Sequence, residues 1–257
     1  MKNAIVYVLA FVVISLIAST IVQGIPMLIV GQRVPLTSTM LIVAAVLSSL
    51  TTIGVFLFLQ WADVSRRYLL TRPWGVMFWC GIAACGVMVP SLCLQEVMPE
   101  LPNYMSSEFD MIMGDRWGYF AIGILAPIAE ELVFRGAVLR ALLRWNRMNH
   151  WLCIGFSALA FALVHANPAQ MPHAFLAGLL LGWLYYRTGS IIPGMVFHWV
   201  NNSLAYILYN LYPDPNIRMV DILGSQRHVA AAVLFSLFIL LPALYQLNLR
   251  MKRAPDD

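Results

Sequence analysis

Long runs of apolar residues, separated by short polar segments, dominate the sequence. A helix needs about 20 apolar residues to cross the hydrocarbon core of a bilayer. Six runs reach that length, and two shorter ones lie between strong runs. Because the runs are continuous rather than alternating, they predict helices and not a β-barrel. We therefore expect an all-α, polytopic protein with about eight transmembrane helices, at residues 4–30, 39–61, 74–97, 117–143, 151–165, 172–187, 190–211 and 228–249.

The composition agrees with a chain that lies in lipid. Of the 257 residues, 61% are hydrophobic and 11% are charged, whereas a soluble domain carries about 25% charged residues. The net charge of +4 is spread over the ends of apolar runs instead of forming one basic patch. The expected partner is thus the lipid bilayer and not nucleic acid. No linker or repeat divides the chain, so we expect a single transmembrane domain over residues 1–257.

The distribution of lysine and arginine predicts the orientation in the membrane. If the N-terminus lies inside, the inner segments carry twelve of the 16 basic residues. The outer segments then hold only Arg33, Arg116, Arg218 and Arg227. This is the bias that sets membrane topology, and an even number of spans agrees with it. We expect a multi-pass protein of the inner cell membrane with both termini in the cytoplasm.

Few ionisable side chains interrupt the apolar runs. They fall on three predicted helices and comprise Glu130, Glu131, His165 and His198, with Asn202 beside the last. Such groups are costly in lipid and usually face a cavity or a partner. Hydrogen bonds between helices are the structural alternative. Because three helices carry these groups together, we interpret them as a functional site.

The two glutamates differ in their helical neighbours. Glu131 precedes Arg135 by four positions, which is the favourable order for an ion pair, so we expect a structural pair there. Glu130 points about 100° away around the helix, and no basic residue follows it at three or four positions. It is therefore the candidate general base. His198 and Asn202 are also four apart, so they share one helical face.

These groups fit two hydrolytic schemes. In the first, Glu130 and His165 activate a water molecule while His198 and Asn202 donate to the oxyanion of a peptide carbonyl, and no cofactor is required. In the second, Glu130, His165 and His198 hold a zinc ion whose bound water attacks, although the sequence contains no HExxH helix. A proton-coupled transporter with a Glu/His relay is a third alternative. The sequence shows no inverted repeat that would favour transport.

Two features constrain how the predicted helices pack. Gly178 and Gly182 form a GxxxG pattern, which predicts a close helix crossing. At 1.5 Å per residue, His165 lies about 21 Å from the inner face of the membrane and Glu130 about 10 Å. The two groups must approach one another to share a water molecule. We therefore expect the fifth helix to start deeper, to tilt, or to end irregularly before Pro168.

Three motifs in this sequence resemble those of the CAAX-protease and bacteriocin-processing (CPBP, or Abi) family of intramembrane endopeptidases. The pattern of that family is EExxxR, then FxxxH, then HxxxN. It occurs here, in the same order, as Glu130-Glu131-Leu-Val-Phe-Arg135, Phe161-Ala-Leu-Val-His165 and His198-Trp-Val-Asn-Asn202. The segment that resembles the catalytic core of the family spans about 117–211.

The resemblance implies an eight-helix glutamate endopeptidase. Glu130 and His165 would activate water, and His198 and Asn202 would form the oxyanion site. The motif residues Glu131, Arg135 and Phe161 would support them. Relatives cut a tripeptide from prenylated CAAX tails or are linked to bacterial peptide maturation and self-immunity, so the implied substrate is a membrane-embedded or lipidated peptide or protein. Members are often labelled metalloproteases, and some act as scaffolds without proteolysis, which is the alternative function.

Overall fold

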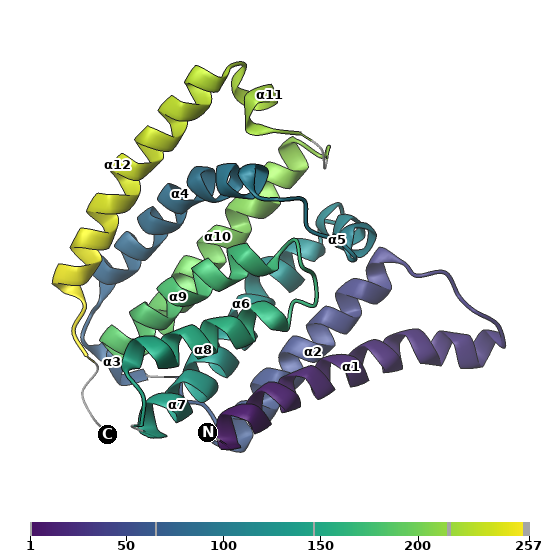
Figure 1. Ribbon diagram of the computed structural model, residues 1–257. Helices are drawn as coiled ribbons and strands as arrows, with labels where there is room; N and C mark the ends of the chain where they lie inside the picture. Colours follow the sequence, from purple (N-terminus) through teal and green to yellow (C-terminus); the bar gives the residue numbers. More distant parts are fainter. Residues whose placement is uncertain (1, 65, 146, 215–216, 254–257) are drawn as a thin grey trace. The chain divides into compact units, whose positions relative to one another are not determined.

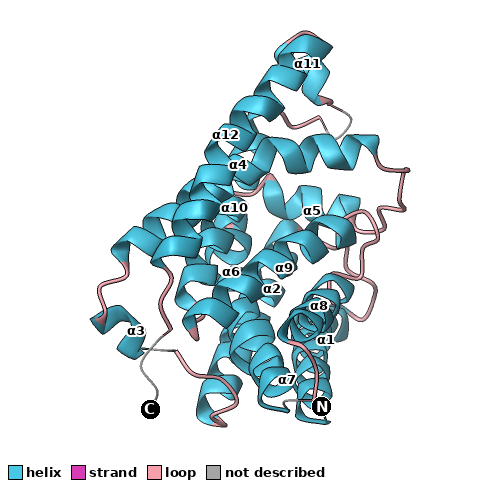
Figure 2. Cartoon of the chain, turned by 60° about the vertical axis from the view of Figure 1, so that its left-hand side comes forward, coloured by secondary structure: helices cyan, strands magenta, loops and turns pink. Residues whose placement is uncertain are grey.

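The computed structural model describes residues 2–64, 66–145, 147–214 and 217–253. Figure 2 shows only helices and loops, and no strand occurs in these ranges, which confirms the all-α prediction. A helix or a continuous series of helical segments occupies each of the eight predicted ranges. In chain order these are α1 (Lys2–Val30), α2 (Ser38–Phe58), α4 (Trp74–Val97), a composite helix, α8 (His150–Leu163), α9 (Met171–Thr188), α10 (Ile192–Leu211) and α12 (Gln226–Arg250). The composite helix joins η1 (Tyr119–Leu125), α6 (Ala126–Glu131), η2 (Leu132–Leu139) and α7 (Arg140–Trp145).

Among the described residues, four helices are long and apolar enough to cross a membrane, namely α1, α2, α4 and α12. Helix α8 is apolar but has only 14 residues, and the composite helix carries several charged side chains. The count of eight spans and the cytoplasmic placement of both termini therefore stay predictions. Met1 and residues 254–257 lie outside the described part of the chain.

Three short helices lie in the polar connections and were not expected from the sequence. They are α3 (Arg66–Leu70), α5 (Ser106–Met113) and α11 (Met219–Leu223). Helices of five to eight residues are too short to produce a readable apolar period. Helix α11 begins where the amide of Met219 donates to Glu96 Oε1 at 2.6 Å, so the end of α4 supplies its first hydrogen bond.

Contacts group the helices into two compact units. The first unit is Met1–Val64 with Asn103–Trp183, and the second is Ser65–Pro102 with Leu184–Asp257. Both units are discontinuous in sequence, and α9 runs across the boundary between them. The single domain over 1–257 therefore stays a prediction, and each unit is described by itself.

In the first unit, α1 and α2 run antiparallel and lie side by side (Figure 1). Aromatic rings join them at one end, where the Tyr7 ring lies 6.0 Å from Phe56 and 5.1 Å from Trp61. Farther along α1, the Phe11 ring meets Phe134 of the composite helix edge-on at 5.5 Å. These contacts place the two membrane-length helices against the helix that carries both glutamates.

In the second unit, α4 packs against α10 and α12 (Figure 1). The crossing of α4 and α12 is close, because a Cβ atom added at Gly86 would lie 2.7 Å from the backbone nitrogen of Leu240. At the C-terminal end of α12, the Arg187 guanidinium donates to the carbonyl of Asn248 at 3.0 Å. Helix α10, which carries His198 and Asn202, is thus held by a membrane-length helix.

Candidate active site

The helix that carries the glutamates is not a regular α-helix. Two π-helical segments, η1 and η2, enclose the six residues of α6, and Glu130 and Glu131 are the last two of those six. Wide π turns are rare and often occur at functional sites, because they change the direction of the side chains that follow. The carbonyl of Phe134 in η2 accepts a hydrogen bond from Ser157 of α8 at 2.8 Å. This bond ties the widened turn to the neighbouring helix.

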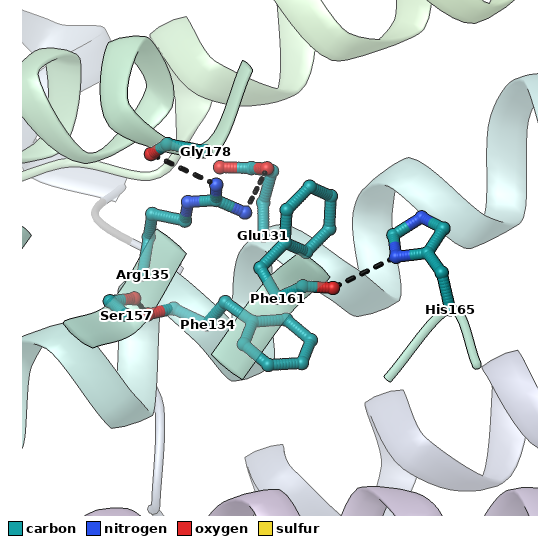
Figure 3. Close-up of polar contacts among 7 residues, drawn as sticks. All are labelled: Glu131, Phe134, Arg135, Ser157, Phe161, His165 and Gly178. Carbon is teal, nitrogen blue, oxygen red and sulfur yellow. Dashed lines mark hydrogen bonds and ion pairs between the residues drawn. The ribbon is translucent and has the colours of Figure 1, made fainter. Parts of the chain in front are cut away.

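The ion pair expected from the sequence is present. Arg135 Nη1 lies 2.9 Å from Glu131 Oε1, and the two side chains are 1% and 0% exposed. Arg135 Nη2 also donates to the carbonyl of Gly178 on α9 at 3.3 Å (Figure 3). A charge buried this deeply is tolerated only with a partner and further hydrogen bonds. Arg135 therefore fixes α6, η2 and α9 relative to one another within the first unit.

A close helix crossing brings α9 within reach of Arg135. A Cβ atom added at Gly178 would lie 2.9 Å from the Cβ of Ala158, and one at Gly182 would lie 2.8 Å from Ile154. Any larger residue would push α9 away from α8. The close crossing that the GxxxG pattern predicts is thus confirmed, and it exposes the backbone carbonyl that Arg135 binds.

His165 lies just beyond the end of α8. The helix ends at Leu163, and Ala166 takes the left-handed conformation with φ of 50°. The irregular end before Pro168, one of the three expected possibilities, is therefore observed. The His165 amide donates to Ala162 at 3.3 Å, while the His165 Nδ1 atom lies 2.8 Å from the carbonyl oxygen of Phe161.

This contact determines the tautomer of the imidazole. A carbonyl oxygen can only accept a hydrogen bond, so Nδ1 must carry the proton that it donates to Phe161. In the neutral ring, Nε2 is then the basic nitrogen. The last carbonyls of a helix lack partners within the helix, and here the His165 side chain satisfies one of them. The His165 side chain thus caps α8 through Nδ1.

The supporting residues form a chain of contacts that ends at His165. The Arg135 guanidinium lies over the Phe161 ring at 4.5 Å, and the His165 ring meets Phe161 edge-on at 5.0 Å. The Phe134 ring also contacts the Phe161 ring, with 5.3 Å between the ring centroids. Figure 3 shows Arg135, Glu131, Phe161 and His165 from left to right. The ion pair therefore positions the histidine through Phe161.

Asn167 is a site residue that the sequence interpretation missed. Its side chain is fully buried. It donates to Asn103 Oδ1 at 2.8 Å and accepts from the amide of Tyr104 at 3.2 Å. The turn that carries His165 is thereby tied to the chain before α5. An asparagine directly before Pro168 is a turn signal that marked this position, but the distant partner left no pattern in the sequence.

The structure separates the two glutamates as their spacing predicts. Glu131 is buried against Arg135, whereas Glu130 is half-buried and faces α1 and α2. There it lines a cavity of about 240 Å³ together with side chains from both helices. Glu130 is therefore the glutamate that a small polar molecule can reach.

His198 and Asn202 lie in the second unit, on one continuous helix, so they share a face of α10. The neighbouring Asn201 donates to Asn202 Oδ1 over a long 3.4 Å. Within either unit, no group of three His, Cys, Asp or Glu side chains among the described residues is arranged to hold a metal ion.

The fold and these residues indicate a broad class of protein. Four membrane-length helices and a buried ion pair beside a histidine are features of a helical membrane protein with a polar site. Comparison with known proteins shows which family part of the chain resembles. Residues 113–204 match the family described as Type II CAAX prenyl endopeptidase Rce1-like, which confirms the resemblance to the CAAX-protease family. No curated protein and no solved structure matches the chain.

Proposed function

We propose that the protein is an intramembrane endopeptidase of the CAAX-protease type in the inner cell membrane. It hydrolyses a peptide bond of a lipidated or membrane-embedded peptide or protein. The observation that carries this proposal is that the family match over residues 113–204 contains all three motifs in order. The eight expected spans and the single domain are part of the same proposal.

In the proposed mechanism, Glu130 and His165 activate one water molecule. Glu130 takes a proton from the water, and the resulting hydroxide attacks the carbonyl carbon of the scissile bond. The proton is then passed to the leaving amine as the C–N bond breaks, so that the carboxylate is regenerated. The Nδ1 bond to Phe161 supports the role of His165, because it leaves Nε2 to hold the water.

His198 and Asn202 provide the proposed oxyanion site. They share one face of α10, and both the imidazole and the carboxamide can carry N–H donors. Donors directed at a developing oxyanion each contribute about 10²- to 10³-fold to the rate. The proposal requires these two side chains to reach the carbonyl oxygen of the bond that the activated water attacks.

A zinc ion held by Glu130, His165 and His198 is the alternative catalytic scheme. These donors suit zinc chemically, but neither unit supplies all three of them. Elemental analysis of the purified protein distinguishes the schemes. The proposed mechanism predicts activity that resists chelators, whereas stoichiometric zinc with loss of activity in phenanthroline would establish the metal scheme.

The proposal is tested by cleavage of a farnesylated peptide that ends in a CAAX sequence. Purified protein in lipid nanodiscs is mixed with the peptide, and mass spectrometry identifies the products. We expect release of the C-terminal tripeptide by the wild type. Glu130→Gln should lose about 10²- to 10⁴-fold in rate because it keeps the shape of the side chain but removes the base. His165→Ala should lose cleavage as well.

The matched control is Glu108→Gln, which changes the same functional group at a partly exposed position of α5. It should cleave at the wild-type rate. Full activity of the Glu130→Gln variant would refute the assigned mechanism. A scaffold or a proton-coupled transporter, the remaining alternatives, would cleave no peptide at all.

A further inference from the structure

A cavity of about 240 Å³ lies between α1, α2 and α6 of the first unit. Its walls from α1 and α2 lie outside the segment that matches the known family. Figure 1 shows α1 and α2 spreading apart as they approach the connection at residues 31–37. Alanines of α2 and α6 leave the space between the helices open. Glu130 of α6 forms part of the wall, so the cavity reaches the proposed general base.

Four serine hydroxyls line this cavity, two from each membrane-length helix. Ser15 and Ser19 come from α1, and Ser48 and Ser49 come from α2. Ser15 and Ser48 bond to one another at 2.9 Å, and Ser15 also donates to the carbonyl of Phe11 at 3.0 Å. This pair joins the helices at one end of the cavity.

The other two serines differ from this pair. Ser49 is only 7% exposed, and within the described part of the chain no hydrogen bond is made by its hydroxyl or by that of Ser19. A serine inside a helix can bond to the carbonyl four residues earlier. A hydroxyl at membrane depth that makes no hydrogen bond is costly in an apolar medium. The two groups therefore suit a polar molecule that enters the cavity.

The arrangement fits an extended polypeptide. The N–H and C=O groups of an extended chain point to both sides of the strand, and each needs a partner at membrane depth. A serine hydroxyl can donate and accept, and the hydroxyls come from the two opposite helices. The apolar side chains of Phe11 and Leu41 complete the walls. Water alone would need no such two-sided arrangement.

We propose that this cavity is a subsite that binds the polypeptide backbone of the substrate beside Glu130. The serine hydroxyls of α1 and α2 satisfy backbone groups next to the scissile bond, so that a segment leaving the lipid keeps its hydrogen bonds. This inference rests on the proposed peptidase function. It assigns substrate binding to two helices that carry none of the family motifs.

The test compares two double variants in the farnesylated-peptide assay. Ser19→Ala/Ser49→Ala removes the two hydroxyls that lack partners. Thr20→Ala/Thr51→Ala removes two exposed hydroxyls from the same helices and is the matched control. We expect the serine variant to raise KM about five- to fiftyfold, because each hydrogen bond contributes about two- to tenfold to binding. Its kcat should stay within about twofold, and the control should match the wild type.

Each outcome decides the inference. An unchanged KM in the folded serine variant, with cleavage by the wild type intact, overturns the subsite and leaves the proposed function standing. A fall in kcat with unchanged KM shows a water-binding role only, and it overturns the subsite too. If the wild type cleaves no such peptide, the proposed function fails and this inference with it. Ser49→Thr, which keeps a hydroxyl, should retain the wild-type KM. If the double variant does not fold, each single serine variant should raise KM about two- to tenfold, and unchanged values refute the subsite.

Discussion

Replacing Arg135 by methionine should strongly destabilise the protein. Arg135 is 1% exposed and forms the ion pair with Glu131 at 2.9 Å. It also donates to the carbonyl of Gly178 at 3.3 Å and lies over the Phe161 ring at 4.5 Å. Methionine fills a similar volume without the charge. The change therefore leaves a buried carboxylate without its cation and an acceptor without its donor.

The magnitude follows from the burial of the pair. Removing one partner of a buried salt bridge costs about 3–5 kcal/mol, and a desolvated cation–π contact adds about 2 kcal/mol. We therefore expect a loss of about 5–7 kcal/mol, which is a large part of the 5–15 kcal/mol that stabilises a typical protein. Removing both charges in Glu131→Leu/Arg135→Met should restore at least about 2 kcal/mol, because no charge is then left buried alone.

Unfolding in mixed micelles measures these free energies. The eight tryptophans of the chain report unfolding by fluorescence as the fraction of denaturing detergent rises. Arg135→Lys should also be destabilised, because one ammonium group cannot replace the planar guanidinium that reaches both Glu131 and Gly178. A single variant as stable as the wild type would refute the account of the ion pair. A double variant no more stable than Arg135→Met would contradict it as well.

Three further changes test the parts around His165. Gly178→Leu should destabilise the protein by about 1–3 kcal/mol, because its side chain meets Ala158 across the α8–α9 crossing; an unchanged thermal midpoint would contradict that crossing. His165→Asn should melt like the wild type but cleave no peptide, since the amide can still donate to Phe161 while the basic nitrogen is lost; retained cleavage would argue against a base at this position. Asn167→Ala should lower stability by about 1–3 kcal/mol and reduce kcat, measured by chemical unfolding and by peptide cleavage; normal values for both would show that its buried bonds do not position the turn.

The apolar pattern was sufficient to locate the long helices, because each run must bury its backbone polar groups within itself. Spacing of four residues was sufficient to predict the Glu131–Arg135 pair and to direct Glu130 to another face. These are local relations along one helix. They need no knowledge of which helices are neighbours.

Relations between distant segments were beyond the sequence. The bonds of Asn167 to Asn103 and Tyr104 cross more than 60 positions of the chain, and no periodicity encodes them. The π-helical turns around α6 were missed because their residues also suit an ordinary α-helix. The serine-lined cavity was missed because Ser19 and Ser49 are far apart in the sequence. They line one cavity only because α1 packs against α2.

The central claim is that Glu130 and His165 share one water molecule, which attacks the peptide carbonyl. The most direct test is the distance from the Glu130 carboxylate to His165 Nε2, measured in an experimental structure of the protein in lipid. One bridging water with two hydrogen bonds of about 2.8 Å spans at most about 6 Å. We expect a separation within that limit. A separation beyond about 10 Å, with the two side chains directed to different surfaces, would contradict the proposed active site.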